Sequence, residues 1–173
     1  MLAIGIMSGT SLDGVDACLV DIKKGKNSKF NIVHFTYVPY DKELKQRILS
    51  VSSNKPCNIQ TICSLNVEIS KAYVKAVKKL LKDSKVKADE IEFIAMHGQT
   101  VWHNPDSRDN YESSTLQLGD PSVLAAAFDV KVISNFRTMD MACGGGGAPL
   151  VPFANYVLYS NKKESIALQN IGG

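Results

Sequence analysis

The order of the hydrophobic patterns is the feature of this sequence that most restricts its fold. Three segments rich in apolar, β-branched and aromatic residues come first, at 2–7, 15–22 and 30–40, and each has the composition of a strand. Helical spacing of apolar residues follows, first after Asp41, a suitable N-cap, and then over 58–83. This order predicts an α/β domain whose mixed sheet begins with three antiparallel strands and has flanking helices.

The remainder of the chain alternates strand and helix patterns. We expect a buried strand at 91–98, an irregular polar stretch at 102–114, a helix over 120–129 and a short strand at 131–133. The final segment, 164–173, has a strand-like part that ends in two glycines and has no return strand. The sequence therefore predicts that the chain is a truncated part of a longer protein.

Composition and charge narrow the range of partners. A chain of 173 residues with 45% hydrophobic and 21% charged residues has the make-up of one folded domain. The formal net charge is only +3, and the lysines between Lys71 and Lys87 alternate with apolar residues at helical spacing. That pattern indicates a solvated helix face. We therefore expect neither a nucleic acid nor a membrane as partner.

The N-terminus and the cysteines indicate the cellular setting. No secretory signal is visible, and no run of about 18 apolar residues could span a bilayer. The four cysteines, Cys18, Cys57, Cys63 and Cys143, form no CxxC pair and no zinc-site spacing. The prediction is a cytoplasmic protein.

A polar loop interrupts the first two predicted strands and carries more chemistry than a turn requires. Residues 8–14 are Ser-Gly-Thr-Ser-Leu-Asp-Gly, whereas a hairpin needs only a two-residue turn such as Asp13-Gly14. Glycines let a backbone approach phosphate oxygens, and N–H groups and hydroxyls can donate to an anion. Asp13 would repel phosphate but could hold Mg²⁺ through water. Phosphate binding and a merely polar turn are both compatible with this loop.

Polar residues also follow the later predicted strands, where ligands commonly bind in α/β sheets. His97, Gln99 and Thr100 come at the end of the fourth predicted strand and could bind a polyhydroxy ligand. The pattern is equally compatible with a His97 whose ring only hydrogen-bonds to the backbone at the end of the strand. Asp120 could be no more than a helix cap. Arg137 could bind a carboxylate or phosphate with two hydrogen bonds, or form a surface ion pair.

Five segments taken together are far more specific than any one of them. In order and in spacing they resemble the anhydro-N-acetylmuramic acid kinase family, and they cover about a third of the chain. The segments are GIMSGTSLDGVD at 5–16, MHGQTVWHNP at 96–105, LQLGDPSVLA at 116–125, NFRTMDMACGGGGAPLVPF at 135–153 and NIGG at 170–173.

This resemblance implies a fold and a reaction. The family has the actin-like ATPase and sugar kinase fold, with two ribonuclease-H-like domains around a cleft. This chain would supply one such domain over 1–165, with the ATP phosphate loop and the sugar-side residues, and the first strand and turn of a truncated second domain at 166–173. The family uses ATP, Mg²⁺ and water to open 1,6-anhydro-N-acetylmuramic acid and phosphorylate O6. The products are N-acetylmuramic acid 6-phosphate and ADP, in peptidoglycan recycling.

The resemblance also assigns roles to residues. The ATP-binding residues would be Gly9, Thr10, Ser11, Leu12, Asp13, Gly14, Val15 and Asp16. The substrate-binding residues would be His97, Gln99, Thr100, Asp120 and Arg137, the last as partner of the lactyl carboxylate. Asp13 is the metal candidate. The family's catalytic aspartate would follow residue 173, so no catalytic residue is expected within the chain, and a homodimer is possible.

Two positions depart from the family pattern. Asn135 replaces the acid of the usual DFR, which should weaken the orientation of Arg137, and Gly146 replaces a glutamine, which should add flexibility. We expect the N-terminal part of an anhydro-sugar kinase that is inactive by itself. The alternative is a degenerate or regulatory sugar-binding half-domain without catalysis.

Overall fold

The computed structural model describes residues 1–23, 29–53, 56–107, 110–161 and 163–169. Contacts between residues divide the chain into two compact units. The first unit comprises Met1–His103 and Leu116–Asn135, and the second comprises Asn104–Thr115 and Phe136–Gly173. The domain boundary expected at residue 165 stays a prediction.

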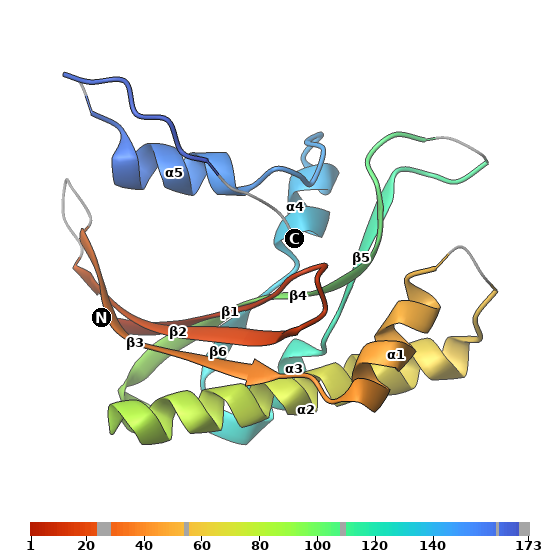
Figure 1. Cartoon of the computed structure of the whole chain (residues 1–173), viewed down its shortest axis with the longest axis horizontal. Helices are drawn as coiled ribbons and strands as arrows, with labels where there is room; N and C mark the ends of the chain where they lie inside the picture. The colour runs from red at the N-terminus through yellow and green to blue at the C-terminus, as the bar shows by residue number, and fades with distance from the viewer. Residues whose placement is uncertain (24–28, 54–55, 108–109, 162, 170–173) are drawn as a thin grey trace. The chain divides into compact units, whose positions relative to one another are not determined.

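The strands of the described residues form one mixed sheet (Figure 1). They are β1 (Leu2–Ser8), β2 (Gly14–Lys23), β3 (Lys29–Pro39), β4 (Ile91–Asn104), β5 (Ser114–Leu118) and β6 (Lys131–Ile133). The strand order is β3-β2-β1-β4-β5, and β6 pairs with β4. β1 and β3 are antiparallel to β2, whereas β4 is parallel to β1 and to β6. This arrangement confirms the predicted mixed α/β sheet of the ribonuclease-H-like class.

The three helices predicted above are present as α1, α2 and α3, and further helices accompany them. In chain order the helices are α1 (Lys42–Val51), α2 (Ile59–Ser84), the short 3₁₀ helix η1 (Ala88–Glu90), α3 (Pro121–Phe128), α4 (Phe136–Ala142) and α5 (Val151–Tyr159). Asp41 caps α1 as predicted, because its carboxylate accepts a hydrogen bond from the Leu44 N–H at 2.7 Å. The long helix α2 ends where Lys85 adopts a left-handed conformation, with φ of 57°.

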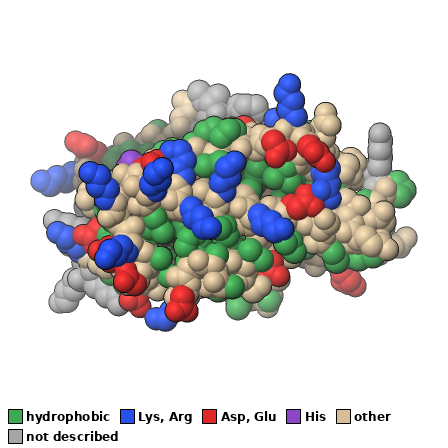
Figure 2. Space-filling model, turned by 90° about the horizontal axis from the view of Figure 1, so that it is seen from below, with side chains coloured by type: hydrophobic (Ala, Val, Ile, Leu, Met, Phe, Trp, Pro, Cys, Tyr) green, Lys and Arg blue, Asp and Glu red, His purple; other side chains and the backbone are tan. Residues whose placement is uncertain are grey.

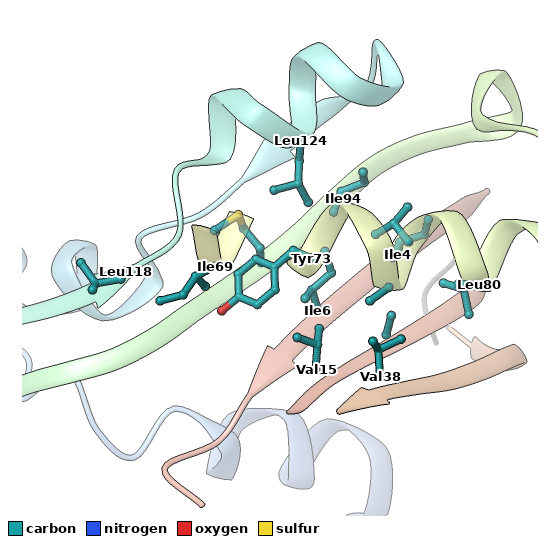
Figure 3. Packing of buried hydrophobic residues seen from close by; sticks show 14 of the residues in the cluster. Ile4, Ile6, Val15, Val38, Ile69, Tyr73, Leu80, Ile94, Leu118 and Leu124 are labelled. Atoms are coloured by element: carbon teal, nitrogen blue, oxygen red, sulfur yellow. The ribbon is translucent and has the colours of Figure 1, made fainter. Parts of the chain in front are cut away.

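The core of the first unit lies between the sheet and α2. Ile4 and Ile6 lie on the same face of β1, because strand side chains alternate, and they are 1% and 4% exposed. Ile69 and Tyr73 of α2 are fully buried in the same cluster (Figure 3). Each such burial contributes about 1.5–3 kcal/mol. The apolar stripe predicted over 58–83 is therefore the face that α2 turns to the sheet.

The other face of α2 carries the lysines. Lys71, Lys75, Lys78 and Lys82 are exposed, and Lys79 forms an ion pair with Asp83 one turn away. Figure 2 shows Lys and Arg side chains spread over this face with hydrophobic side chains between them. None of the helices in the described ranges combines the length and the apolar character needed to cross a membrane.

The structure differs from the sequence-based expectations in three places. β4 continues to Asn104, so its last three residues belong to a strand where an irregular stretch was expected. The helix α4 was not predicted. Residues 165–169 form no strand with another described segment, and residues 170–173, the NIGG of the expected turn, lie outside the described residues. A strand needs a pairing partner, which the sequence of 164–173 does not supply.

Candidate functional site

The loop between β1 and β2 is held by its own backbone and by one buried side chain. The Leu12 N–H donates to the Gly9 carbonyl oxygen at 3.2 Å and closes a turn. Leu12 has φ of 54°, a left-handed conformation that costs about 1–2 kcal/mol. Its side chain is only 4% exposed, and burial of about 1.5–3 kcal/mol offsets this strain. The loop is therefore anchored at Leu12, while Thr10 and Ser11 are exposed.

Asp13 is held through both its carboxylate and its backbone carbonyl. The carboxylate accepts hydrogen bonds from the Ser11 hydroxyl at 2.8 Å and from the Gly14 N–H at 3.1 Å. The carbonyl accepts from the Tyr37 hydroxyl at 2.8 Å and from the Tyr40 N–H at 3.0 Å. The Ser11 hydroxyl is the main cause that holds the pKa of the Asp13 carboxyl below its ordinary value. The loop thus presents a fixed, exposed carboxylate that is ionised near neutral pH.

Gly9 and Gly14 have different surroundings, and packing requires a glycine at only one of these two positions. A Cβ on Gly14 would lie 2.4 Å from the Val38 carbonyl oxygen and 2.8 Å from the Pro39 Cα, so the close approach of β3 requires this glycine. A Cβ on Gly9 would meet nothing closer than the Ser11 hydroxyl oxygen at 3.5 Å, an ordinary contact. Packing within the first unit explains Gly14 and leaves room beside Gly9.

The rest of the predicted ATP segment is partly buried. Within the described part of the chain, the backbone N–H groups of Thr10 and Ser11 donate to no protein acceptor. Val15 is 0% exposed, so its side chain belongs to the core. The Asp16 side chain is exposed, and desolvation, followed by repulsion from Asp13, raises the pKa of its carboxyl. Two neighbouring carboxylates of this kind favour a nearby cation.

A bulge in β4 decides which way its polar residues face. Ile6 and Ser8 of β1 are two residues apart, but their partners in β4, Met96 and Gln99, are three apart. The extra residue is accommodated at Gly98, whose φ of 83° is in the range that glycine tolerates. Gln99 therefore lies on the same face as Met96, the face that α2 covers, and is 0% exposed.

His97 and Thr100 remain accessible on either side of the bulge. Both side chains are half-buried. The Nδ1 of His97 lies 2.7 Å from the Gly98 carbonyl oxygen. The Thr100 hydroxyl accepts a hydrogen bond from the Gln117 side-chain amide at 3.3 Å. These two side chains are partly accessible, whereas the side chain of Gln99 is 0% exposed among the described residues; contact of any of the three with a sugar stays a prediction.

Sequence reasoning missed the polar residues that surround Gln99. The Gln99 amide nitrogen donates to the Gly9 carbonyl oxygen at 3.1 Å, and its amide oxygen accepts from the Tyr40 hydroxyl at 3.4 Å. The hydroxyls of Ser8 and Tyr73 share a hydrogen bond of 2.6 Å. One signal was available, because a tyrosine on a buried helix stripe needs a partner for its hydroxyl.

Asp120 caps α3. Its carboxylate accepts hydrogen bonds from the Ser122 N–H at 2.9 Å and from the Ser122 hydroxyl at 2.6 Å. The hydroxyl, as the larger cause, holds the pKa of Asp120 below its ordinary value. The Asp120 N–H donates to the Ser70 hydroxyl oxygen at 2.6 Å. The cap is confirmed, and a contact of this carboxylate with a sugar stays a prediction.

In the second unit, Arg137 and Asp140 of α4 hold the glycine-rich loop that follows the helix. The Arg137 Nη1 donates to the Gly147 carbonyl oxygen, and the Gly147 N–H donates to the Asp140 carboxylate, both at 2.7 Å. A Cβ on Gly145 would lie 2.2 Å from the Asp140 carboxylate, so a side chain there would displace the carboxylate that accepts from the Gly147 N–H. A Cβ on Gly146 would meet nothing closer than 3.5 Å. The arginine therefore has a structural contact within its own unit.

The two departures from the family pattern have simple backbone explanations. Asn135 has φ of 60°, a left-handed conformation that Asn and Asp adopt more readily than other non-glycine residues. Asn and the usual acid therefore both suit this position. The space around Gly146 likewise accepts a side chain.

The site as described is a polar loop linked to the middle of β4 within the first unit. Gln99 makes the direct hydrogen bond between them, and Arg137 belongs to the second unit. Among the described residues, no three His, Cys, Asp or Glu side chains come together as a metal site. Asp13 is the exposed carboxylate within the loop, so any cation there would need ligands from elsewhere.

The sheet order and the glycine- and hydroxyl-rich loop after β1 define a ribonuclease-H-like α/β protein with a polar loop that could face an anion. The family model described as "Anhydro-N-acetylmuramic acid kinase" matches residues 1–173. The chain belongs to this anhydro-N-acetylmuramic acid kinase family.

Curated relatives agree with this assignment. An anhydro-N-acetylmuramic acid kinase of Bacillus cereus is 48% identical over 174 residues, which cover 100% of this chain and 45% of that protein. The enzyme of that name from Clostridioides difficile is 45% identical, with the same coverage of both chains. The chain thus spans about half the length of the curated relatives it matches. Among solved structures, that of Thermus thermophilus RuvC has a TM-score of 0.39 and 16% identity, over 97% of this chain and 85% of that chain.

Proposed function

We propose that this chain is the N-terminal, ligand-binding part of an ATP-dependent kinase for 1,6-anhydro-N-acetylmuramic acid. The observation that carries the proposal is the segment at residues 9–16, which comprises the loop and the start of β2. It is anchored at Leu12, exposes backbone and hydroxyl donors, and has open space beside Gly9. Family membership supports this choice of substrate, and a cytoplasmic setting and a place in peptidoglycan recycling are part of the same proposal.

The loop would bind the ATP phosphates through backbone N–H groups. Thr10 and Ser11 are exposed, and their N–H groups have no protein acceptor among the described residues. Consecutive N–H groups of this kind form an anion-binding concavity, and the missing side chain of Gly9 lets phosphate oxygens come close. The left-handed Leu12 sets the turn before any ligand arrives, so little ordering entropy is lost on binding.

Asp13 is suited to hold Mg²⁺ through water rather than to touch phosphate. Its carboxylate is exposed, and the Ser11 hydroxyl keeps it ionised. Bound Mg²⁺ would supply neutralisation of the phosphate charge that develops during phosphoryl transfer. The neighbouring Asp16, whose pKa is raised by desolvation and by Asp13, would ionise more readily beside such a cation.

The sugar would contact the accessible residues beside the bulge of β4 and two candidates later in the chain. His97 and Thr100 offer ring nitrogen and hydroxyl groups to a polyhydroxy ligand. Asp120 and Arg137 are further candidates, the arginine for the lactyl carboxylate. In the proposed reaction, the water oxygen bonds to the anomeric carbon as the bond from that carbon to O6 breaks, and O6 takes the γ-phosphoryl group of ATP as ADP leaves. One water proton stays on the new anomeric hydroxyl, and the other goes to a carboxylate base, which the resemblance assigns to a segment after residue 173.

Calorimetric titration of the 173-residue chain with Mg-ATP and, separately, with the anhydro sugar tests this function. Binding is the readout, because the catalytic aspartate is not expected within the chain. Gly9→Ala should lower the affinity for Mg-ATP at least about tenfold, since the new methyl group occupies the phosphate side of the loop and one charge-assisted hydrogen bond is lost.

Gly5→Ala is the matched control for that variant. Gly5 is also in the first unit and has nothing within 4 Å of a built Cβ, so both variants should fold as well as the wild type. His97→Ala should weaken binding of the sugar and leave binding of Mg-ATP unchanged. Equal Mg-ATP affinity for Gly9→Ala and Gly5→Ala would contradict the phosphate-loop assignment.

The alternative of a degenerate or regulatory half-domain predicts sugar binding without turnover even when the rest of a family kinase is supplied in trans. Asn135 and Gly146 give it no structural support, because their backbone conformation and surroundings accept the usual residues as well. Sugar-dependent ADP release in such a mixture would exclude this alternative.

A further inference from the structure

We propose that Gln99 and Tyr40 are positioning residues that hold the loop at residues 9–13, and that Gln99 does not contact the sugar. The proposal rests on the function proposed above, where this loop binds the ATP phosphates. Gln99 is 0% exposed and lies on the sheet face that α2 covers. A ligand outside the sheet therefore cannot reach its amide, although neighbouring His97 and Thr100 are accessible.

Both ends of the Gln99 amide are in use. The amide nitrogen donates to the Gly9 carbonyl oxygen at 3.1 Å and lies 3.5 Å from the Thr100 carbonyl oxygen. The amide oxygen accepts from the Tyr40 hydroxyl at 3.4 Å. A primary amide satisfies both neighbours, with a donor toward the Gly9 carbonyl and an acceptor toward the Tyr40 hydroxyl, and a buried polar atom without a partner is costly. The surroundings of this side chain thus suit a primary amide.

The carbonyl of Gly9 is the point at which this amide acts on the loop. It accepts two hydrogen bonds, from the Leu12 N–H at 3.2 Å and from Gln99. The first bond closes the turn, and the second ties that turn to β4. The peptide plane that holds this carbonyl also holds the Thr10 N–H, so fixing the carbonyl fixes the direction of an N–H group proposed to meet phosphate.

A second buried contact fixes the residue that precedes the loop. Ser8 shares a hydrogen bond of 2.6 Å with the Tyr73 hydroxyl, and its own hydroxyl lies 3.5 Å from the Gly98 carbonyl oxygen. The end of β1 is therefore joined to α2 as well as to β4. Together with the hydrogen bond from Gln99 to Gly9, this contact restrains the loop from shifting along the sheet.

The arrangement links the two proposed ligand sites. Gln99 lies between His97 and Thr100 on β4, and its side chain ends on the nucleotide loop. A ligand that moves or rigidifies residues 97–100 of β4 would also change how firmly the Gln99 amide holds the Gly9 carbonyl. Binding of the sugar and of Mg-ATP should consequently be coupled, and the coupling should pass through this amide.

Amide hydrogen exchange of the ligand-free 173-residue chain, followed by NMR, tests the positioning role without any ligand. Gln99→Met keeps the length and removes both hydrogen-bonding groups. It should accelerate exchange of the Leu12 N–H about tenfold relative to core amides of α2, as expected for loss of one buried hydrogen bond. Tyr40→Phe removes one hydroxyl and should have a smaller effect in the same direction. The double variant should be no worse than Gln99→Met, because Tyr40 acts on the loop through the Gln99 amide, which Gln99→Met already removes.

Ser70→Ala is the control for lost buried polar contacts. The Ser70 hydroxyl is also buried, and it bonds to the Asn66 and Asp120 carbonyl oxygens instead of the loop. This variant should lower global stability and leave the relative exchange of Leu12 unchanged. If Gln99→Met proves unable to fold, Tyr40→Phe alone carries the test. Unchanged relative exchange of Leu12 in the folded Gln99→Met and Tyr40→Phe chains would overturn the proposal.

Titration with Mg-ATP then separates this inference from the proposed function. Wild-type binding that weakens about tenfold in Gln99→Met and not in Ser70→Ala supports both. If the wild-type chain binds no Mg-ATP, the function proposed for the loop fails, and the exchange result still decides whether Gln99 positions it. An equal loss of affinity in Gln99→Met and Ser70→Ala would show a merely structural effect and count against the positioning role.

Discussion

The hydroxyl oxygens of Ser8 and Tyr73 lie 2.6 Å apart, so a buried hydrogen bond joins the last residue of β1 to the middle of α2. Tyr73 is 0% exposed, and its burial raises the pKa of the phenol well above its ordinary value. The tyrosine is thus a neutral hydrogen-bonding group near neutral pH. It anchors the strand that leads into the loop at residues 9–13.

Tyr73→Phe should lower the free energy of unfolding by about 1–2 kcal/mol, because it leaves the buried Ser8 hydroxyl without its short partner. Urea unfolding followed by circular dichroism measures this change. The control is Tyr37→Phe, which removes the hydroxyl that donates to the Asp13 carbonyl oxygen from a ring that is 43% exposed. A loss in Tyr37→Phe as large as that in Tyr73→Phe would contradict the importance given to burial.

Gly14→Ala should destabilise the fold by about 1–3 kcal/mol, since its Cβ would lie 2.4 Å from the Val38 carbonyl oxygen and β2 would have to move away from β3. Gly5→Ala, in open space on the neighbouring strand, should change the stability by less than about 0.5 kcal/mol. Thermal unfolding of the two variants makes the comparison. Equal melting temperatures would show that β3 does not impose a glycine at position 14.

The left-handed backbone at position 135 gives a test of the family departure. Asn135→Asp should keep the stability within about 0.5 kcal/mol, because aspartate also tolerates φ of 60°. Asn135→Val should cost about 1–2 kcal/mol, because a β-branched side chain strongly disfavours this conformation. The denaturant midpoints of the two variants, compared with that of the wild type, measure these changes in stability. A tolerated valine would mean that the backbone is not held in the left-handed region.

The cap of α3 should make stability fall in acid. The Ser122 hydroxyl and N–H hold the pKa of Asp120 below its ordinary value of 3.8. Because the folded state binds this proton less tightly than the unfolded state, the stabilisation is complete above 3.8 and is lost as the pH falls through the lowered pKa. Ser122→Ala should raise the Asp120 pKa toward 3.8, as measured by NMR titration of its carboxyl carbon. An unchanged Asp120 titration in this variant would be evidence against the Ser122 contact.

Much of the fold could be predicted because local sequence determines local structure. The helix expected over 58–83 is α2, Ile59–Ser84, and the caps expected at Asp41 and Asp120 are present. Apolar spacing and capping side chains act within one or two turns, so they are visible without tertiary information. The three leading strands and the polar loop between the first two are also where the sequence puts them.

The candidate site could be predicted only in part. Gln99 was expected on the sugar side with His97 and Thr100, because the resemblance to the family assigns all three to substrate binding. The bulge at Gly98, which is a matter of pairing register between β1 and β4, turns it to the opposite face. The sequence alone contains a glycine there but not the identity of the strand that β4 pairs with.

By itself, then, the sequence determined the three leading strands, the helices α1, α2 and α3 with their starts, and the polar loop that follows the first strand. These depend on interactions between residues close together in the chain. Only the tertiary structure decided that β3 requires Gly14, that Gln99 is buried on the carbonyl of Gly9, and that Tyr73 reaches Ser8. Each of these joins residues between 24 and 90 positions apart, and such contacts form only when the sheet and α2 are packed together.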